Sequence, residues 1–257
     1  MNSIREKAAA FILIACAANL FVSFGAHADV AVEKDSRIPT PAELTRLPAY
    51  CPHTQIISKR YGHQQSASNQ DAVTKPFVKM YGKDFWHLHH YCFGLTAALR
   101  AEYQSSPADR QAELLKSINQ YDYVITRVGP GSLILPELHM QKGLSLIKLK
   151  RGEEAVLQLK RAIQLNPDFA QSYIELSNYY ADSGKKTLAL QTLEEGLGVS
   201  PEAPNLKERY AKLGGTKTFA KPETPQQAAT QPDQAGQAPR ADEQIGSPTN
   251  PYCRFCP

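Results

Sequence analysis

The sequence predicts an all-α protein in which helix hairpins stack into a solenoid, followed by a disordered C-terminal tail. The first reason is a pattern between Pro136 and Pro201 that is written twice at an interval of 34 residues. The positions that recur are Ala155 and Ala189, Leu159 and Leu193, Pro167 and Pro201, and the small residues Gly143 and Ser177. Such a period is typical of helix-hairpin repeats, in which small residues let paired helices approach and proline ends the second helix.

The second reason is helical periodicity within both copies. Apolar residues such as Leu144 and Ile147 recur at i, i+3, i+4 and i+7, a spacing that gathers them on one face of a helix. The third reason is turn chemistry, because Arg151-Gly152 and Asp182-Ser183-Gly184 are suited to tight connections between helices. Two unrelated amphipathic helix pairs are the alternative interpretation of the same stretch.

The repeated pattern resembles the tetratricopeptide repeat. The second copy starts at Ala170 and places the following residues on the eight signature positions of that family: Tyr173, Leu176, Ser177, Tyr180, Ala189, Leu193, Gly196 and Pro201. Gly196 stands where alanine is usual. The first copy starts at Pro136 and keeps Gly143, Ala155, Leu159, Ala162 and Pro167, but it carries His139 and Lys142 where an aromatic residue and a leucine are usual.

Residues 1–28 have the features of an export signal. Arg5 and Lys7 precede an apolar run, and Ala26-His27-Ala28 fits a cleavage site with small residues. We therefore expect a mature chain that is periplasmic or secreted, with cleavage after Ala28. The alternative is a lipoprotein anchored at Cys16, because Leu13-Ile14-Ala15-Cys16 resembles a lipobox.

Charge gives little support to nucleic-acid binding. The chain carries a net charge of +4, and loss of the leader with Arg5, Glu6 and Lys7 lowers this to about +3. No cluster of Lys and Arg is interleaved with aromatic residues, as a nucleic-acid interface requires. We expect no nucleic-acid partner, and contact with a membrane only if Cys16 is lipidated.

Export changes the meaning of the cysteines, because disulfides persist in oxidising compartments. The mature chain holds Cys51, Cys92, Cys253 and Cys256, and four cysteines allow three pairings. The simplest joins Cys51 to Cys92 and Cys253 to Cys256. Cys253 and Cys256 have the spacing of a redox pair, but they lie in the predicted tail, so a tail disulfide or a mixed disulfide with a partner is favoured over catalysis.

Residues 29–46 lack apolar periodicity and are expected to form an extended leader. Residues 47–131 should be helical. An amphipathic helix is predicted to end near Glu102, and a second helix begins at Ser106-Pro107, where serine caps the end and proline is tolerated. This hairpin is interpreted as a divergent repeat with Gly94 as its small contact residue.

Residues 132–215 are expected to contain the two repeats and a short closing helix from Pro204 to Leu213, whose polar outer face keeps the end of a repeat stack soluble. Residues 216–257 hold seven prolines, six glutamines and almost no aliphatic residues. Such a composition cannot bury enough surface to offset its ordering entropy. We expect this tail to be disordered.

The histidine-rich stretch from His87 to His90 raises the question of a metal. On a helix, His87 and His90 share one side while His89 points away, so His87 and His90 are weak candidates for an ion completed by Cys51, His53 or His139. The alternative is that His90 takes the place of a repeat aromatic. No zinc-protease, phosphate-loop or nucleophile-elbow motif is present in the sequence. We therefore expect no enzyme and no cofactor.

Binding of another protein is the function that remains. The resemblance implies that the first helix of each hairpin lines a groove, which selects Glu137, Met140, Leu144 and Lys148 in the first copy and Gln171, Ile174, Asn178 and Asp182 in the second. A peptide or a partner helix suits this mixture of polar and apolar residues. The alternative for Met140 and Leu144 is packing on the preceding hairpin.

Residues 44–213 also resemble a group of uncharacterised exported bacterial proteins with such repeats, through the stretches from Leu47 to Gln55, from His87 to Cys92 and from Leu135 to Glu137. In that group the pairing of two cysteines fits a Cys51–Cys92 bridge. The sequence thus predicts a non-catalytic adaptor of the bacterial cell envelope. The alternative is a metal- or redox-linked envelope module built on the histidine stretch and the cysteines.

Overall fold

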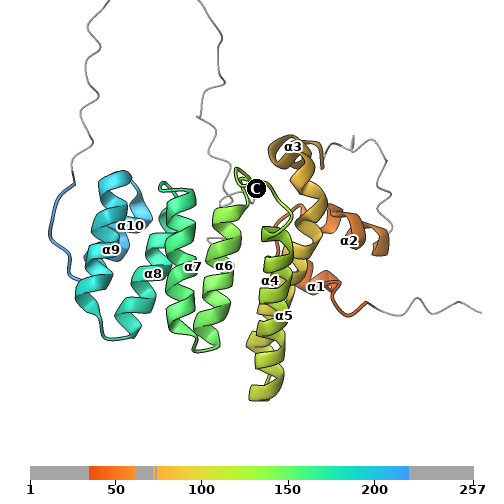
Figure 1. Cartoon of the computed structure of the whole chain (residues 1–257), viewed down its shortest axis with the longest axis horizontal. Coiled ribbons are helices and arrows are strands. Elements are labelled where there is room, and N and C mark those ends of the chain that lie inside the picture. The colour runs from red at the N-terminus through yellow and green to blue at the C-terminus, as the bar shows by residue number, and fades with distance from the viewer. Residues whose placement is uncertain (1–34, 62–71, 73, 220–257) are drawn as a thin grey trace, which may run out of the picture. The chain divides into compact units, whose positions relative to one another are not determined.

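The computed structural model describes residues 35–61, 72 and 74–219. The export signal, Cys16, Cys253 and Cys256 lie outside these residues. In the described part every regular element is a helix (Figure 1), which confirms the all-α prediction. The α-helices are α1 (Pro41–Leu44), α2 (Gln55–Arg60), α3 (Thr74–Tyr81), α4 (Leu88–Tyr103), α5 (Pro107–Ile125), α6 (Leu135–Lys148), α7 (Gly152–Leu165), α8 (Ala170–Asp182), α9 (Lys186–Val199) and α10 (Pro204–Lys212), with 3₁₀ turns at Cys51–His53 and Gly82–His87.

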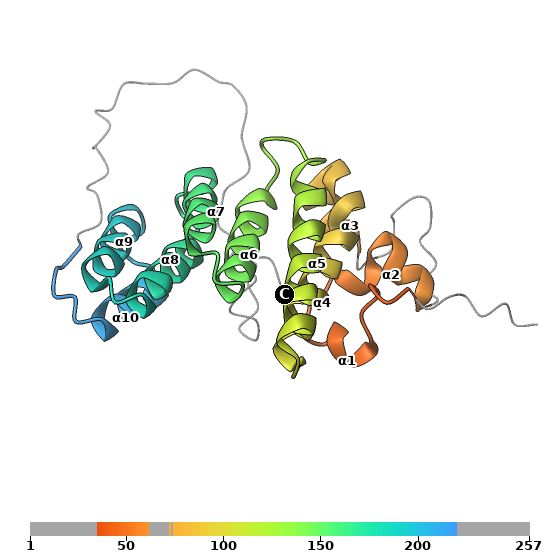
Figure 2. The same ribbon diagram turned by 60° about the horizontal axis from the view of Figure 1, so that its bottom comes forward.

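Three helix hairpins follow one another along the chain. They are α4 with α5, α6 with α7 and α8 with α9, and α10 closes the last pair (Figures 1 and 2). Adjacent hairpins pack through α5 on α6 and through α7 on α8. The hairpin pattern expected from the 34-residue interval is therefore present, and the helical region before it supplies one more hairpin.

Small residues lie where paired helices meet. Ala155 and Ala189 are both fully buried, as close packing within each hairpin requires. A Cβ atom on Gly143 would lie 2.9 Å from Cγ of Leu159. In the same way, a Cβ atom on Gly94 would lie 2.3 Å from the ring of Tyr121, so Gly94 permits the close approach of α4 and α5.

The connections differ slightly from the sequence expectation. Gly184 follows α8 with φ of +74°, as the predicted turn requires, whereas the left-handed residue between α6 and α7 is Lys150 with φ of +61°. Gly152 is instead the first residue of α7. Its lack of a side chain leaves room for Tyr179, whose hydroxyl would lie 1.9 Å from a Cβ atom at this position.

Two boundaries of the predicted domains need correction. The expected extended leader, residues 29–46, contains helix α1, which is capped by Thr40 and begins with Pro41. Residues 216–219, which we assigned to the disordered tail, are ordered against the last helices. The Phe219 ring packs edge-on against Tyr210 at 5.6 Å, and Lys217 pairs with Glu194.

The core before the repeats contains a disulfide bond. Cys51 is bonded to Cys92, with the two Cα atoms 5.8 Å apart. Both residues are completely buried among aromatic and aliphatic side chains that include Tyr50, Phe85 and Tyr91. The bond attaches the segment that follows α1 to the N-terminal half of α4.

Candidate functional site

A groove of about 500 Å³ runs along the first helices of the three hairpins. Its residues come from α4, α6, α8 and the segment after α1: Arg46, Leu47, Pro48, Tyr91, Leu95, Ala98, Leu99, Glu102, Gln141, Leu144, Lys148 and Glu175. The α4 residues are spaced by three or four positions and form one helical face. The groove is thus bounded by α4, by α6 with α8, and by residues 46–48.

Two contacts show that α4 and α6 run parallel in register. The hydroxyl of Tyr91 donates to Oε1 of Glu137 at 2.9 Å, and Nζ of Lys148 donates to Oε1 of Glu102 at 2.9 Å. Tyr91 and Glu102 are eleven residues apart, as are Glu137 and Lys148. These two pairs therefore mark the two ends of the groove.

The first end is acidic and partly buried. Oε1 of Glu137 also accepts from Nε2 of Gln141 at 2.9 Å, while its Oε2 atom is buried without a hydrogen-bond partner. Burial raises the pKa of this carboxyl from 4.5 to about 7, and the neighbouring Glu175 adds to the rise. Glu175 lines the groove and accepts from Nε2 of Gln171 at 2.6 Å and Nδ2 of Asn178 at 3.4 Å.

The second end carries two cations around one carboxylate. Glu102 pairs with Lys148 at 2.9 Å and with Arg46 at 3.7 Å. The guanidinium of Arg46 also lies over the Tyr103 ring, 5.6 Å from its centroid. All three charged side chains of this cluster are close to half exposed, so they remain available to a bound partner.

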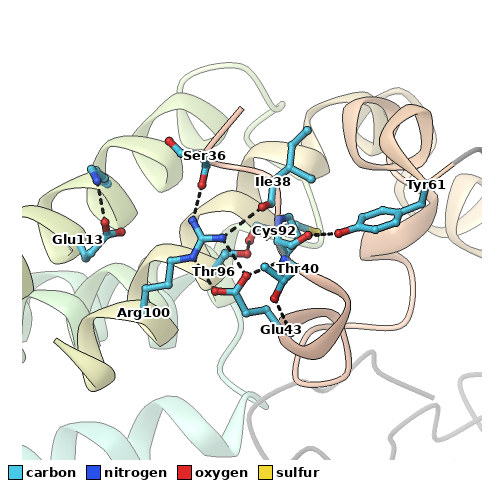
Figure 3. A network of polar contacts seen from close by, with 11 residues as sticks. Ser36, Ile38, Thr40, Glu43, Tyr61, Cys92, Thr96, Arg100 and Glu113 are labelled. Atoms are coloured by element: carbon cyan, nitrogen blue, oxygen red, sulfur yellow. Dashed lines mark hydrogen bonds and ion pairs between the residues drawn. The ribbon is translucent and has the colours of Figure 1, made fainter. Parts of the chain in front are cut away.

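The wall formed by residues 46–48 is held in place from both sides. The Cys51–Cys92 bond fixes it on one side. On the other side, Arg100 of α4 binds Glu43 of α1 through two hydrogen bonds, of 2.6 Å and 2.8 Å. Arg100 also donates to the backbone oxygens of Ser36 and Ile38 (Figure 3). The hydrogen bond from Arg100 holds the pKa of Glu43 down at about 2.

The groove residues expected from the repeats lie in different surroundings. Glu137 and Met140 are 3% and 0% exposed, which corrects their assignment as contact residues, because they pack beneath the surface and against the neighbouring helices. Gln171 and Asn178 hold Glu175 in position, and Asp182 is exposed at the end of α8 and is not among the residues that line the groove. Lys148 lines the groove, as does Leu144.

Sequence reasoning missed the wall and the α4 face. Leu95, Leu99 and Glu102 repeat at helical spacing in the histidine-rich helix. If α4 is treated as the first helix of a hairpin, this spacing predicts that these residues line the groove. Residues 46–48 gave no such signal, because only the folded chain brings them to α4.

The histidine stretch is engaged in packing. The His90 ring stacks on Tyr123 with centroids 3.6 Å apart, and its Nδ1 lies 2.6 Å from Oε1 of Gln120. Burial lowers the pKa of His90, and it lowers that of His89 to about 4. Across residues 35–61, 72 and 74–219, no three His, Cys, Asp or Glu side chains are grouped as metal ligands. Cys51 is excluded as a ligand because it is in a disulfide.

The fold and groove define the class of protein as a helical repeat protein. Residues 136–169 and 170–202 each match the family model described as "Tetratricopeptide repeat". The chain therefore carries two such repeats, with a further hairpin before them and a closing helix after them. Proteins of this fold are typically non-catalytic adaptors for other proteins.

Similar proteins cover only parts of the chain. The "Protein STIP1 homolog" of Dictyostelium discoideum is 29% identical over 82 residues, which is 30% of this chain and 14% of that protein. The human "Protein O-mannosyl-transferase TMTC1" is 29% identical over 98 residues, 38% of this chain and 11% of that protein.

One solved structure is also similar to part of the chain. The chain in "TPR2B-domain:pHsp70-complex of yeast Sti1" is similar over 46% of this chain and 96% of its own, with 20% identity and a TM-score of 0.34.

Among the helices of the described residues, none has both the length and the apolar character that crossing a membrane requires.

Proposed function

We propose that this protein is a non-catalytic adaptor of the bacterial cell envelope that binds a peptide or helix of a partner protein in the groove between residues 46–48, α4, α6 and α8. The observation that supports this most directly is the lining itself. Its centre consists of Leu47, Pro48, Leu95, Ala98, Leu99 and Leu144, and its two ends carry charged residues. An apolar centre with polar ends is the usual character of a recognition surface.

The polar contacts beneath the groove support binding in preference to catalysis. The buried carboxyl of Glu137 lies beneath the groove and is hydrogen-bonded by Tyr91 and Gln141. Neither partner is a nucleophile activated by a base, so the arrangement shapes the groove and offers no reaction centre. In a binding site of this type, affinity comes from apolar side chains that leave water, and specificity comes from the charged ends.

The test is partner capture from envelope extracts of the native host with two matched variants. Leu144→Glu places a charge in the apolar centre, whereas Leu157→Glu makes the same change at a residue of α7 that is 66% exposed and outside the groove. Proteins identified by mass spectrometry should be captured by the wild type and Leu157→Glu and lost with Leu144→Glu. Equal capture by both variants would exclude the groove as the binding site.

The envelope location rests on the leader sequence, so it has a separate test. We expect fractionation to place the protein in the periplasm or medium, and mass spectrometry to find Asp29 at the mature N-terminus. A lipid-modified N-terminus at Cys16 would instead show that the protein is anchored to a membrane. An intact Met1 in a cytoplasmic fraction would refute the envelope role without affecting the groove.

A further inference from the structure

We propose that the occupant of the groove is an amphipathic partner helix that lies parallel to α4, with basic residues at its N-terminal end and acidic residues at its C-terminal end. This inference rests on the proposed function and adds the chemistry and the direction of the ligand. Three features carry it: the length of the groove, the opposite charge of its two ends, and the apolar lining between them.

The length follows from the register of α4 and α6. The acidic end lies at Tyr91 and Glu137, and the basic end lies at Glu102 and Lys148. Eleven residues at 1.5 Å per residue separate these two ends along each helix, about 16 Å. An occupant helix of three turns therefore reaches from one end to the other.

The acidic end lacks a positive partner. Glu137 and Glu175 receive their hydrogen bonds from neutral groups, namely the hydroxyl of Tyr91 and the amides of Gln141, Gln171 and Asn178. Within the described residues, no ion pair joins either carboxylate to Lys or Arg. Lys or Arg of a partner would supply the missing charge at Glu175, which lines the groove.

The basic end has the opposite imbalance. Arg46 and Lys148 share the single carboxylate of Glu102, so this cluster carries one positive charge in excess. Lys148 also borders a neighbouring cavity that is lined by Arg110, Lys150 and Arg151. Asp or Glu of a partner would be attracted to this end, and an added cation would be repelled.

The apolar centre favours a helix over an extended peptide. The side chains of this centre, which include Leu47, Leu95 and Leu144, carry no hydrogen-bonding group. The backbone N–H and C=O groups of α4 and α6 are used within their own helices. An extended peptide would leave its N–H and C=O groups unpaired in this region, which is costly. A helix pairs these groups internally, and its dipole has the correct sign in the parallel direction, positive at the acidic end.

The experiment uses a phage-displayed library of random 16-residue peptides selected on the immobilised full chain. We expect enriched peptides to carry apolar residues at i, i+3, i+4 and i+7, with Lys or Arg before them and Asp or Glu after them. The best peptide is then synthesised together with a version of equal composition in which the basic and acidic residues are exchanged. In fluorescence anisotropy, the exchanged peptide should bind about tenfold more weakly.

Variants of the protein test the same point. Glu175→Lys combined with Lys148→Glu reverses the two ends and should favour the exchanged peptide. Glu175→Gln serves as a milder change that should reduce the preference, while Lys160→Glu alters an exposed residue of α7 and should not. Circular dichroism of each variant shows that the helices are retained.

The possible results separate this inference from the proposed function. Peptides that need Leu144 but show no charge order, the reverse order, or no helical spacing would overturn the inference and leave the groove as the binding site. Binding that is seen only after residues 220–257 are removed would show that the chain's own segment is the occupant, which also overturns it. Absence of any enriched peptide, or binding unaffected by Leu144→Glu, would count against both.

Discussion

At the scale of single residues, Glu137 is the most informative position, because its carboxyl is buried among groups that do not carry positive charge. It accepts hydrogen bonds from Tyr91 and Gln141, and it interacts electrostatically with Tyr50, Tyr81, Tyr121 and Glu175. Burial raises its pKa from 4.5 to about 7. The folded protein therefore holds this proton at pH values where the unfolded chain has released it.

This gives a prediction for stability against pH. Between about pH 4.5 and 7 the unfolded chain has lost the proton and the folded chain has not, so stability falls as pH rises, by about 3 kcal/mol in total. Below this window both states are protonated, and above it both are ionised. Glu137→Gln should remove this loss, which urea unfolding at pH 5 and pH 8 would show. Glu153→Gln, at an exposed residue of α7, is the control, and an unchanged pH dependence in Glu137→Gln would refute the prediction.

At the scale of the elements, the hairpins depend on small residues at the contacts between helices. His139 and Lys142, which depart from the repeat signature, make polar contacts with neighbouring helices. Nδ1 of His139 lies 2.8 Å from Oε1 of Gln158 on α7, and Nζ of Lys142 donates to Asp122 of α5 at 2.6 Å. Repeats of one family can therefore differ in their side chains while they keep the same helix packing.

Gly94 tests whether the first hairpin uses the same packing. In Gly94→Ala, the new methyl group would lie 2.3 Å from the ring of Tyr121, which is fully buried. Forcing α4 and α5 apart should lower the free energy of unfolding by about 1 to 3 kcal/mol. Gly131→Ala, where nothing lies within 4 Å, should change it by less than about 0.5 kcal/mol. Equal unfolding curves for the two variants would show that the close approach is not needed.

At the scale of the whole molecule, the disulfide joins the segment before the hairpins to the first of them. Cys51 and Cys92 are separated by 41 positions, and closing a loop of this length in the unfolded chain contributes about 3 to 4 kcal/mol by the chain-entropy model. The double variant Cys51→Ala with Cys92→Ala should be destabilised by this amount in urea unfolding. Wild type unfolded with a reductant should show the same loss. A stability equal to that of the oxidised wild type would contradict a structural role.

The fold could be read from the sequence because its determinants are local. Ala155, Leu159 and Pro167 recur in the second repeat at one interval, and each acts within its own hairpin by packing or by ending a helix. The cap at Ser106 and the small residue at Gly94 act in the same way. Helical contacts reach only a few residues along the chain, so a single sequence carries them.

The groove could be predicted only in part, because it is assembled from distant segments. Lys148 and Leu144 lie on the expected helix face, yet the family positions of Glu137 and Met140 are buried, Glu137 against Tyr91 of the extra hairpin and Met140 against Leu159 and Leu176 of α7 and α8. Residues 46–48 reach the groove through the disulfide and through the contact of Arg100 with Glu43. The sequence alone determined the hairpins, since their causes are periodic and local. Only the tertiary structure decided which polar and charged side chains meet at the two ends of the groove, since that depends on contacts between residues 46 positions apart.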